Sequence, residues 1–415
     1  MIQKIKGTMD IMPEEAPLWR YIEGVMREEA ARFGYGEIRT PTFENTELFV
    51  RGVGDTTDVV QKEMYTFADR DESRSISLKP EGTASVVRAI IENGRCGGAM
   101  PLKYYYITNC FRHEKPQAGR SREFVQFGTE MFGSESPLSD ATAIALAHSV
   151  LVRLGLGDKV RLNLNSIGCK NCRPNYRAAL VDYFRKNEQR LCPTCKDRLE
   201  KNPLRLLDCK VEACHAIAIN APKTVDNLCP ECEEKFTFLC NALDAMGIEY
   251  TVNPSIVRGL DYYTGAVFEF ISEGIGAQST VCGGGRYDGL VESLGGPALS
   301  GIGFGMGITR IILAMQAAGT VPTLTEVPDI YVAPLGRAAQ LLALSITHKL
   351  RGEGYYAECD IVERSLKAQM KYAGKIGARY ALIIGENEVN EGMATLRDMQ
   401  TGLEKRVLLS GFTLE

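Results

Sequence analysis

The stretch FRHEKPQAGRSREFVQFGTE, residues 111–130, decides the fold and raises the question of function. It holds the loop KPQAGRS, which carries Pro and Gly, between two runs rich in aromatic and β-branched residues, KYYYITNCFRHE (103–114) and REFVQFGTEMFG (122–133). Both runs alternate with a period of two, and such runs on either side of a turn-forming loop predict a β-hairpin. The sequence therefore predicts two adjacent antiparallel strands.

One face of this hairpin is unusually polar. Successive side chains of a strand point to opposite faces, so we expect Arg112 and Glu114 to share a face of the first strand. By the same rule Phe124, Gln126 and Glu130 share a face of the second. Arginine suits a phosphate or carboxylate and glutamate suits an amine, which predicts a ligand with an anionic and an aminic group. A solvated face of an edge hairpin is the alternative.

A second unusual stretch, SGIGFGMGITR (300–310), has glycine at every other position. One face of this strand would have no side chains, which weakens a strand unless something flat approaches the backbone. A planar base near Arg310 is one explanation, and close packing of the strand on a helix is the other. The chain lacks a G-x-x-x-x-G-K-[ST] loop and GGGRYDG does not fit G-x-G-x-x-G, so a P-loop or Rossmann enzyme is disfavoured.

Changes of pattern along the chain predict an α/β protein with several parts. Strands without regular helices between them predict an α+β core with a mostly antiparallel sheet, built from residues 1–160 and 251–319. Between these two parts lies a helical, cysteine-rich insertion, 161–250. Two prolines mark a linker at 320–329, and alternation of strands and helices then predicts a C-terminal α/β domain with a parallel sheet at 330–415.

Size and composition narrow the class of protein. The chain has 415 residues, 45% of them hydrophobic, which is more than one core usually holds and predicts two or three domains. The N-terminus has no apolar signal region and no apolar run reaches about 18 residues, so we expect a cytoplasmic protein without a membrane span. The net charge of −4 disfavours a broadly basic nucleic-acid coat and leaves local patches for such contacts.

Eight of the nine cysteines in the insertion stand in pairs separated by two or four residues. This spacing suits tetrahedral Zn²⁺ coordination at one or two sites, and free buried thiols explain it equally well, so the sequence leaves the metal open. The eight are Cys169, Cys172, Cys192, Cys195, Cys209, Cys214, Cys229 and Cys232.

These stretches together carry a family resemblance. The opening stretch resembles motif 2 of class II aminoacyl-tRNA synthetases, GIGFGMGITR resembles motif 3, and FGYGEIRTPTFENTELF resembles motif 1 at the dimer interface. The stretches KPEGTA, RGLDYYTGAVFEF and GGGRYDGLVESLGG resemble signatures of the histidyl-tRNA synthetases, and SLKAQMKYAGKIGA resembles their anticodon-binding domain. The resemblance covers essentially the whole chain.

The resemblance implies a histidine pocket. Its members in this chain are Glu81, Thr83, Arg112, Gln126, Glu130, Arg258, Tyr262 and Tyr263. In the family, the positions of Glu81 and Gln126 hold the α-amino group and that of Glu130 holds an imidazole nitrogen, while the two tyrosines line the far side. Arg258 takes the position of a family-specific arginine that contacts the α-phosphate where other class II enzymes use a second metal ion. Arg258 and Arg112 are thus the implied catalytic residues.

The resemblance also implies an ATP site, formed by Arg112, Glu114, Arg120, Phe124 and Arg310. In the family, the position of Arg112 contacts the α-phosphate and the substrate carboxylate, and that of Glu114 reads the adenine amino group. The positions of Phe124 and Arg310 sandwich the adenine. Many relatives have Glu immediately before the motif 3 arginine, whereas this chain has Thr309, which leaves the orientation of Arg310 open.

The implied activity is ATP-dependent ligation of L-histidine to tRNA(His) through a histidyl-adenylate, with Mg²⁺ accompanying ATP and with release of pyrophosphate and AMP. Such a reaction needs in-line geometry and cations where negative charge builds up, and no protein nucleophile. A homodimer is implied too. The alternative is a non-catalytic, synthetase-like, histidine-sensing regulatory subunit of histidine biosynthesis, a class that typically lacks the insertion and the anticodon-binding domain.

A basic stripe near the C-terminus is the candidate tRNA contact. Arg364, Lys367, Lys371 and Lys375 follow one another at three- and four-residue spacing, with no acid in 365–379, and we expect them on one helix face. A solvated helix face is the alternative, and the resemblance to an anticodon-binding domain favours tRNA.

Overall fold

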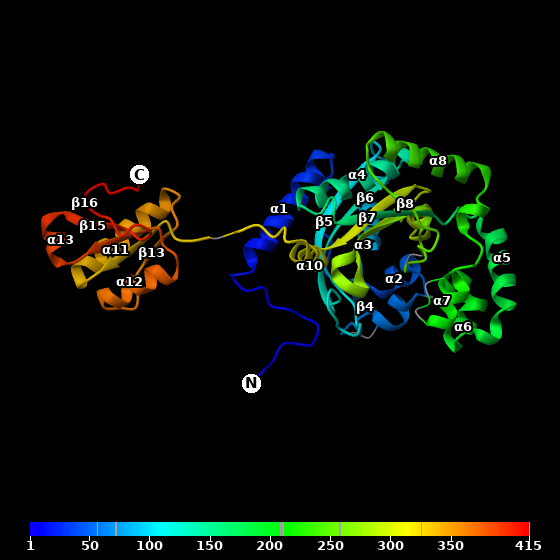
Figure 1. Cartoon of the computed structure of the whole chain (residues 1–415), viewed down its shortest axis with the longest axis horizontal. Helices are drawn as coiled ribbons and strands as arrows, with labels where there is room; N and C mark the ends of the chain where they lie inside the picture. The colour runs from blue at the N-terminus through cyan, green and yellow to red at the C-terminus, as the bar shows by residue number, and fades with distance from the viewer. Residues whose placement is uncertain are drawn as a thin grey trace. The chain divides into compact units, whose positions relative to one another are not determined.

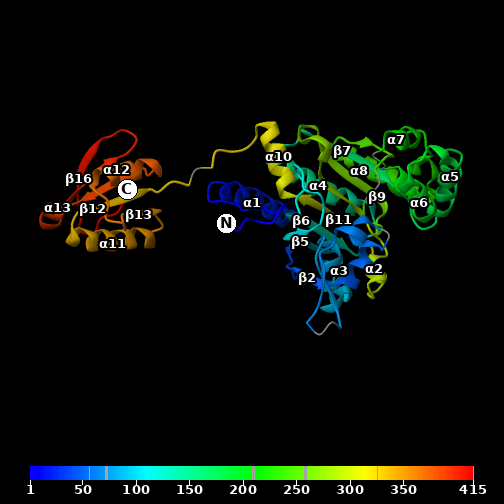
Figure 2. The same cartoon turned by 90° about the horizontal axis from the view of Figure 1, so that it is seen from below.

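The computed structural model describes residues 1–55, 57–70, 73–207, 209, 211–256, 259–324 and 326–414, without the side chains of residues 277 and 278. The chain forms two compact units, Met1–Pro322 and Thr323–Glu415 (Figures 1 and 2). No helix among the described residues is long and apolar enough to cross a membrane.

An eight-stranded sheet forms the centre of the first unit. Its strands stand in the order β1 (Gly36–Glu37), β5 (Leu102–Phe111), β6 (Glu123–Phe132), β11 (Gly301–Gly307), β10 (Thr280–Arg286), β9 (Thr264–Ser272), β7 (Val160–Ser166), β8 (Thr251–Val252). Only the two outermost pairs, β1 with β5 and β7 with β8, are parallel. This confirms the predicted mostly antiparallel sheet.

The predicted hairpin is present as β5 and β6, which pair over their whole length. The first strand ends at Phe111, however, so Arg112 and Glu114 lie in the loop and not on a strand face as predicted. The Glu114 amide donates to the Arg112 carbonyl at 2.8 Å, and a hydrogen bond across two residues turns the chain away from the strand direction. Both side chains are therefore placed by this loop.

Three helices bury the apolar face of the sheet (Figure 1). They are α1 (Ala16–Arg32), α4 (Pro137–Arg153) and α10 (Ile308–Ala318). The periodic residues Ile22, Val25, Met26 and Ala30 of α1 are buried in this core, as their three- and four-residue spacing predicts. Phe127 and Met131 of β6 meet them from the sheet, which leaves the opposite face of β6 to the polar side chains.

A smaller layer lies beside the other face of the sheet. It consists of the strands β2 (Phe43–Asn45), β4 (Ser75–Leu78) and β3 (Thr66–Ala68), the helices α2 (Thr46–Val53), α3 (Thr83–Glu92) and α9 (Leu290–Ser293), and the short helical turns η1 (Val59–Glu63) and η2 (Arg95–Gly97). The turn η6 (Glu273–Gln278) packs instead against α10. Helix α3 begins at Thr83, two residues after Glu81.

The insertion is helical, as predicted, but starts later. Residue 161 falls inside strand β7, which continues the sheet to Ser166, so the helical part follows that strand. Its elements are α5 (Arg173–Arg185), η3 (Glu188–Arg190), α6 (Pro193–Lys201), η4 (Pro203–Leu206), α7 (Glu212–Ala218), η5 (Thr224–Asn227) and α8 (Pro230–Ala245). α8 returns to the main core through Leu239 and Leu243, whereas α5 to α7 enclose a small core of their own.

The second unit has the predicted alternation of strands and helices. Its elements are β12 (Ile330–Pro334), α11 (Arg337–Gly352), β13 (Ala357–Cys359), α12 (Leu366–Lys375), β14 (Tyr380–Ile384), α13 (Glu386–Glu391), β15 (Met393–Asp398) and β16 (Glu404–Leu408). The sheet order is β13-β12-β14-β15-β16, and the first three strands are parallel. An antiparallel hairpin, β15 and β16, extends this sheet and was not predicted.

Candidate active site

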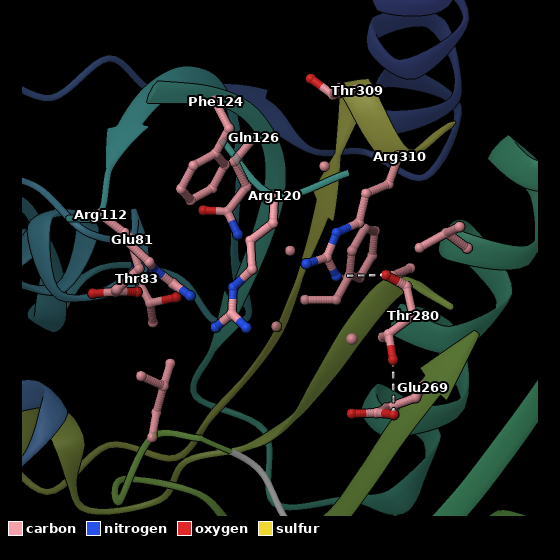
Figure 3. Close-up of a pocket in the computed structure, with 18 of the residues that line it drawn as sticks. Glu81, Thr83, Arg112, Arg120, Phe124, Gln126, Glu269, Thr280, Thr309 and Arg310 are labelled. Atoms are coloured by element: carbon pink, nitrogen blue, oxygen red, sulfur yellow. Dashed lines mark hydrogen bonds between the residues drawn. The ribbon is translucent and has the colours of Figure 1, made fainter. Parts of the chain in front are cut away.

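A cavity of about 290 Å³ lies on the polar face of the central sheet, over β6, β11, β10 and β9. Ten of the predicted histidine- and ATP-binding residues line it: Glu81, Thr83, Arg112, Glu114, Arg120, Phe124, Gln126, Tyr262, Tyr263 and Arg310. Arg258 lies outside the described residues. Figure 3 shows Phe124 and Gln126 on one side of the cavity and Thr280 and Arg310 on the other.

Glu130 lies buried beneath this cavity, with 1% of its surface exposed. Its carboxylate accepts hydrogen bonds from the hydroxyls of Thr83 (2.7 Å), Tyr106 (3.1 Å) and Tyr287 (2.5 Å). Burial raises the pKa of Glu130 to about 8, although the hydroxyl of Tyr287 opposes this shift. A carboxyl group held by three hydroxyls of lining residues thus lies beneath the cavity.

The glycines of β11 make room for protein side chains. A Cβ on Gly303 would lie 2.0 Å from a Glu130 oxygen, and one on Gly305 would lie 2.1 Å from the Gln126 amide nitrogen. The predicted bare surface is therefore covered at these two positions by Gln126 and Glu130 of the neighbouring strand. Glycine is needed here because the partner side chains cross the strand, and the expectation of an uncovered strand face for a flat base was wrong at these positions.

Glu81 is placed at the start of α3. Its two carboxylate oxygens accept hydrogen bonds from the amides of Thr83 (2.7 Å) and Ala84 (2.9 Å), which are the first free N–H groups of the helix. Burial raises the pKa of Glu81, and the two amide donors counter this rise. Glu81 thus caps a helix and also lines the cavity, so its carboxylate is fixed before any ligand arrives.

Two arginines are aimed by backbone carbonyls. Arg112 Nε donates to the Pro80 carbonyl at 2.9 Å. Arg310 donates from Nε to the Gly119 carbonyl at 2.9 Å and from Nη1 to the Thr280 carbonyl at 2.8 Å. A carbonyl orients a guanidinium without adding the full negative charge of a carboxylate, so these contacts fix the directions of both side chains.

Arg120 and Glu114 form an ion pair within the hairpin loop. Figure 3 shows the Arg120 side chain in the space between Phe124 and Arg310. The guanidinium of Arg112 lies 5.5 Å from the centre of the Phe124 ring, so the aromatic face is already paired with a cation on one side.

Thr309 is the second residue of α10 and precedes Arg310. Its buried hydroxyl oxygen has no hydrogen-bond partner among the residues that the structure describes, and Figure 3 shows it pointing away from the Arg310 guanidinium. The carbonyls of Gly119 and Thr280 direct Arg310 in this chain, without a contribution from the side chain at 309.

Several cavity residues were missed by sequence reasoning. Tyr106 and Tyr287 contact Glu130, and Glu269 lines the opposite wall and accepts a hydrogen bond from the Thr280 hydroxyl at 3.2 Å. The alternation of β5 offered a signal for Tyr106, because it shares a strand with the motif 2 stretch. Glu269 and Tyr287 lie within the stretches RGLDYYTGAVFEF and GGGRYDGLVESLGG, which offered a signal for both, but the neighbours of their side chains are set by the pairing of distant strands.

The N-terminal segment also supports the site. The carbonyl of Gly7 accepts hydrogen bonds from the amides of Arg122 (2.8 Å) and Glu123 (3.3 Å), where β6 leaves the hairpin loop. A Cβ on Gly7 would lie 2.8 Å from Arg122 and 2.9 Å from Pro116, and its φ is +92°. Glycine is required here for the backbone conformation and for the close approach to the loop.

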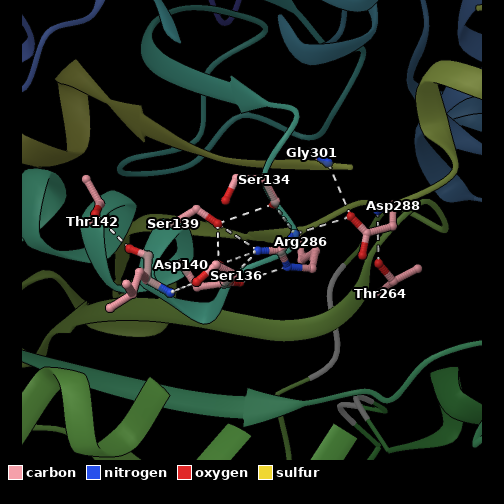
Figure 4. A network of polar contacts seen from close by, with 10 residues as sticks. Ser134, Ser136, Ser139, Asp140, Thr142, Thr264, Arg286, Asp288 and Gly301 are labelled. Carbon is pink, nitrogen blue, oxygen red and sulfur yellow. Dashed lines mark hydrogen bonds and ion pairs between the residues drawn. The ribbon is translucent and has the colours of Figure 1, made fainter. Parts of the chain in front are cut away.

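A second polar centre lies at the end of β10, around Arg286 (Figure 4). Arg286 is 7% exposed and pairs with Asp140, and its other donors reach the Ser139 hydroxyl, the carbonyls of Ser134 and Ser136, and the Asp288 carboxylate. All five N–H groups of the guanidinium therefore have an acceptor. Asp288 in turn accepts from the Gly301 amide at 3.2 Å. This network joins β10, β11 and the start of α4.

The four predicted tRNA contacts lie in the second unit. Lys367, Lys371 and Lys375 are exposed on α12. Arg364 precedes that helix, so the prediction that all four share one helix face was wrong for this residue. It forms an ion pair with Asp360 at 2.5 Å and its guanidinium lies 4.2 Å from the centre of the Tyr372 ring. The Asp360 carboxylate also accepts the Arg364 amide at 2.8 Å, which fixes the chain before the helix.

Comparison with known proteins gives consistent results. A family model described as Histidyl-tRNA synthetase matches residues 7–311, and one described as Anticodon binding domain matches residues 329–412. Two curated proteins named "Histidine--tRNA ligase" are similar over almost their whole length. The protein of Caldanaerobacter subterraneus subsp. tengcongensis is 51% identical, covering 97% of this chain and 96% of that protein. The protein of Acetivibrio thermocellus is 50% identical, with coverages of 99% and 98%.

The same relationship holds at the level of structure. The crystal structure of apo histidyl-tRNA synthetase from S. aureus matches with a TM-score of 0.84 at 36% sequence identity, covering 99% of this chain and 98% of that one. The family model spans most of the chain, and the relatives extend the match over both units. The chain therefore belongs to the histidyl-tRNA synthetase family.

Proposed function

We propose that this protein ligates L-histidine to tRNA(His) in two steps at the cavity, using ATP and passing through a histidyl-adenylate. The observation that carries this proposal is the convergence of Arg112, Arg310 and Gln126 on one cavity, with the buried Glu130 hydrogen-bonded to Thr83 of the lining. Such a site offers cations for phosphate and carboxylate beside acceptors for an amine and an imidazole, which are the groups of the two substrates.

In the first step, a carboxylate oxygen of histidine attacks the α-phosphorus of ATP. The bond from that phosphorus to the bridging oxygen breaks, and pyrophosphate leaves. Negative charge builds up on the α-phosphate oxygens, and Arg112 is assigned to stabilise it together with Arg258, whose placement rests on the family resemblance alone. The carbonyl that aims Arg112 supports this role, because a preoriented cation loses little energy in reorganisation.

The amino acid is assigned to the deep end of the cavity. Gln126 and Glu81 would hold the α-amino group and Glu130 an imidazole nitrogen, with Thr83, Tyr262 and Tyr263 enclosing the ligand. The three hydroxyls on Glu130 support this assignment, because they orient its carboxyl group while burial keeps water away.

The adenine is assigned to the space between Phe124 and Arg310, with Glu114 accepting a hydrogen bond from its amino group. Arg120 pairs with Glu114 in this space and would have to exchange that partner for the nucleotide. Its positive charge then becomes available to the phosphates of ATP.

Mg²⁺ would enter with ATP. Mg²⁺ prefers carboxylate and phosphate oxygens. Glu269 supplies a carboxylate in the cavity lining and would hold the ion. The donor chemistry of the cavity therefore fits this ion, which supplies charge neutralisation on the phosphates when bound.

In the second step, a ribose hydroxyl at the 3′ end of tRNA(His) attacks the carbonyl carbon of the adenylate. The bond between this carbonyl carbon and the phosphate oxygen breaks, and AMP leaves. The second unit would bind the anticodon region, with Lys367, Lys371 and Lys375 contacting phosphates. Their exposure on α12 supports this assignment.

A homodimer in the cytoplasm is the proposed state of the enzyme. The resemblance of residues 33–49 to motif 1 supports a dimer. So does the exposure of apolar side chains in the first 12 residues, among them Ile2, Ile5 and Met12. Light scattering of the purified protein tests this, and a mass of one chain across micromolar concentrations would reject it.

One pair of assays decides between a ligase and a regulatory subunit. We expect histidine-dependent exchange of labelled pyrophosphate into ATP, followed by charging of tRNA(His). A histidine-sensing regulator would bind histidine and perform neither reaction. The presence of the insertion and of a matching anticodon-binding domain supports the ligase.

A further inference from the structure

Eight thiols of the insertion form two compact groups. The outer group consists of Cys169, Cys172, Cys229 and Cys232, and the inner group consists of Cys192, Cys195, Cys209 and Cys214. In each group the four sulfur atoms lie within 4.8 Å of one another. All eight are free thiols, and none of them lines the catalytic cavity.

The sulfur separations match one tetrahedral ion. In the outer group, Cys169 Sγ lies 3.8 Å from Cys172 Sγ and 3.9 Å from Cys229 Sγ. Four sulfurs at about 2.3 Å from a central zinc ion stand about 3.8 Å apart, by the geometry of a tetrahedron. Disulfides would bring two sulfurs to about 2.05 Å. A four-iron cluster would hold its cysteines farther apart, because the cluster itself fills the centre.

Backbone amides donate to the sulfurs in both groups. Cys169 Sγ accepts from the Asn171 amide at 3.3 Å and Cys172 Sγ from the Cys229 amide at 3.1 Å. In the inner group, Cys214 Sγ accepts from the Cys192 amide at 3.2 Å. N–H donors favour a thiolate over a thiol and fix the direction of the sulfur, as outer partners of metal ligands do.

The two groups are nested along the chain. The outer group joins the two ends of the insertion, because Cys169 and Cys229 are 60 residues apart. The inner group joins segments that lie between those ends. A metal that closes such a loop removes conformational freedom from the unfolded chain. Each group therefore ties together helices that are distant in sequence.

The insertion needs such ties because its own core is small. Among its described residues, eleven are buried in this core, and they include three of the inner cysteines, Cys195, Cys209 and Cys214. Cores of this size rarely hold a fold without disulfides or a metal, and the thiols here are free.

We propose that each cysteine group binds one Zn²⁺ ion through four thiolates, so that the chain carries two structural zinc ions. Four soft sulfur ligands in tetrahedral order select Zn²⁺ among the common divalent ions. Each site is closed, because all four coordination positions are filled by protein, and a closed site stabilises structure without activating water. Each thiol that binds loses its proton to solvent.

Both sites also support one wall of the cavity. Arg173 follows Cys172 and donates to the Tyr263 carbonyl, and the Gly265 amide donates to the Gly168 carbonyl at 3.0 Å. From the inner helices, Arg205 contacts the Asp261 carboxylate at 3.2 Å and the Gly259 carbonyl at 3.1 Å. Residues 259–265, which include Tyr262 and Tyr263 of the cavity, are thus held from the insertion.

Metal analysis of the full-length protein, purified without chelators, tests the proposal directly. We expect two zinc ions per chain. The variants Cys192→Ser/Cys195→Ser and Cys169→Ser/Cys229→Ser should each retain one, and Cys96→Ser, whose thiol belongs to neither group, should retain two. Each four-thiolate site holds one ion, so less than about one-tenth of a zinc ion per chain would overturn the proposal. Iron in place of zinc would overturn it too.

A second measurement covers the case in which the variants do not fold. A mercurial reagent is added stepwise to the unmodified protein in the presence of a chelator that changes colour with zinc. Release of two zinc ions as eight thiols react supports the proposal, and reaction of the eight thiols without zinc release contradicts it. Protein loaded with Co²⁺ should also show the strong visible bands of tetrahedral cobalt thiolates in place of the weak bands of octahedral cobalt.

The link to the cavity has its own readout, which rests on the proposed ligase function. Loss of the inner zinc should raise the KM for histidine more than the KM for ATP in pyrophosphate exchange, because Tyr262 and Tyr263 are assigned to the amino acid. Equal changes in both KM values would show that the inner zinc does not act on the histidine side of the cavity in particular, and would limit zinc to a structural role. Metal content is measured without any substrate, so failure of the ligase proposal would not be mistaken for failure of the zinc proposal.

Discussion

The central sheet holds two polar centres, one enclosed by its protein partners around Arg286 and one that faces a cavity. Around Arg286, every guanidinium N–H has a protein acceptor and the opposing charge of Asp140 lies in the same network. Around the cavity, Arg112 and Arg310 are aimed by carbonyls and Glu130 is held by neutral hydroxyls. A satisfied network enclosed by protein fixes the fold, and polar groups that line a cavity are placed to meet a ligand.

This difference predicts that substitutions at the two centres affect different measurements. At Arg286 the loss should appear in the free energy of unfolding, and at the cavity it should appear in catalysis. Trp19, the single tryptophan, is buried in the core of the first unit and reports the unfolding of that unit by its fluorescence.

The largest expected effect is on stability. Arg286→Met leaves the Asp140 carboxylate buried without its partner, which should cost about 3–5 kcal/mol of unfolding free energy. Urea titration followed by Trp19 fluorescence measures the loss. The double variant Arg286→Met/Asp140→Leu should recover much of it, because removing both charges leaves none unpaired. A single variant as stable as the unmodified protein would show that the network does not fix the fold.

The next effect is on catalysis. Arg112→Ala should lower kcat/KM in pyrophosphate exchange about 10²–10³-fold, since a preoriented donor at the developing charge is removed. The same variant should change the unfolding free energy by about 1 kcal/mol, the worth of one hydrogen bond to the Pro80 carbonyl. The control is Arg161→Ala, an exposed arginine on β7 paired with Glu273, which should change neither quantity appreciably. Equal stability losses at Arg112 and Arg286 would remove the distinction between the centres.

The third effect is on the pH dependence of stability and concerns Glu130. Its pKa is about 8 in the folded protein against an ordinary 4.5, so between these values the folded state keeps a proton that the unfolded chain releases. The free energy of unfolding should therefore fall as pH rises from 4.5 to about 8, by at most about 1.4 kcal/mol per pH unit. Glu130→Gln should lack this contribution. Parallel pH profiles of the two proteins would show that Glu130 titrates normally.

How well the sequence predicts each element depends on whether its contacts are with residues near or far along the chain. The hairpin, the α1 face and the strand–helix alternation of the second unit follow from local periodicity, which the sequence displays directly. The strand β10 was not predicted, because its three consecutive glycines, Gly283 to Gly285, carry no strand propensity and pair only in the sheet. Arg286 at its end was missed for the same reason.

The membership of the cavity was predicted in part, and its arrangement was not. The resemblance identified ten lining residues, yet the crossing of Gln126 and Glu130 over the glycines of β11 depends on strand register. Register between distant strands is set by tertiary packing, which local patterns do not encode. The nesting of the cysteine groups is likewise invisible in their spacing, because pairs of thiols at a fixed spacing do not reveal which pairs combine.

The second unit holds both paired and unpaired cations among its described residues. Arg364 is committed to Asp360 and the ring of Tyr372, whereas Lys367, Lys371 and Lys375 make no ion pair with any residue that the structure describes. The lysines are thus the better candidates for phosphate contacts, although all four cations belong to one basic stretch.

The smallest predicted effect follows from this contrast. The triple variant Lys367→Ala/Lys371→Ala/Lys375→Ala should weaken tRNA charging and reduce its dependence on salt, with the logarithmic slope falling by about 0.7–0.9 for each phosphate that is no longer neutralised. Pyrophosphate exchange, which needs no tRNA, should not change. Lys405 is an exposed lysine on β16 of the same unit, and Lys405→Ala is the matched control.

Arg364 is already paired with Asp360 within the protein. Arg364→Ala should therefore destabilise the second unit and leave the salt slope of tRNA charging unchanged. An unchanged slope in the triple variant would reassign α12 as an ordinary solvated face.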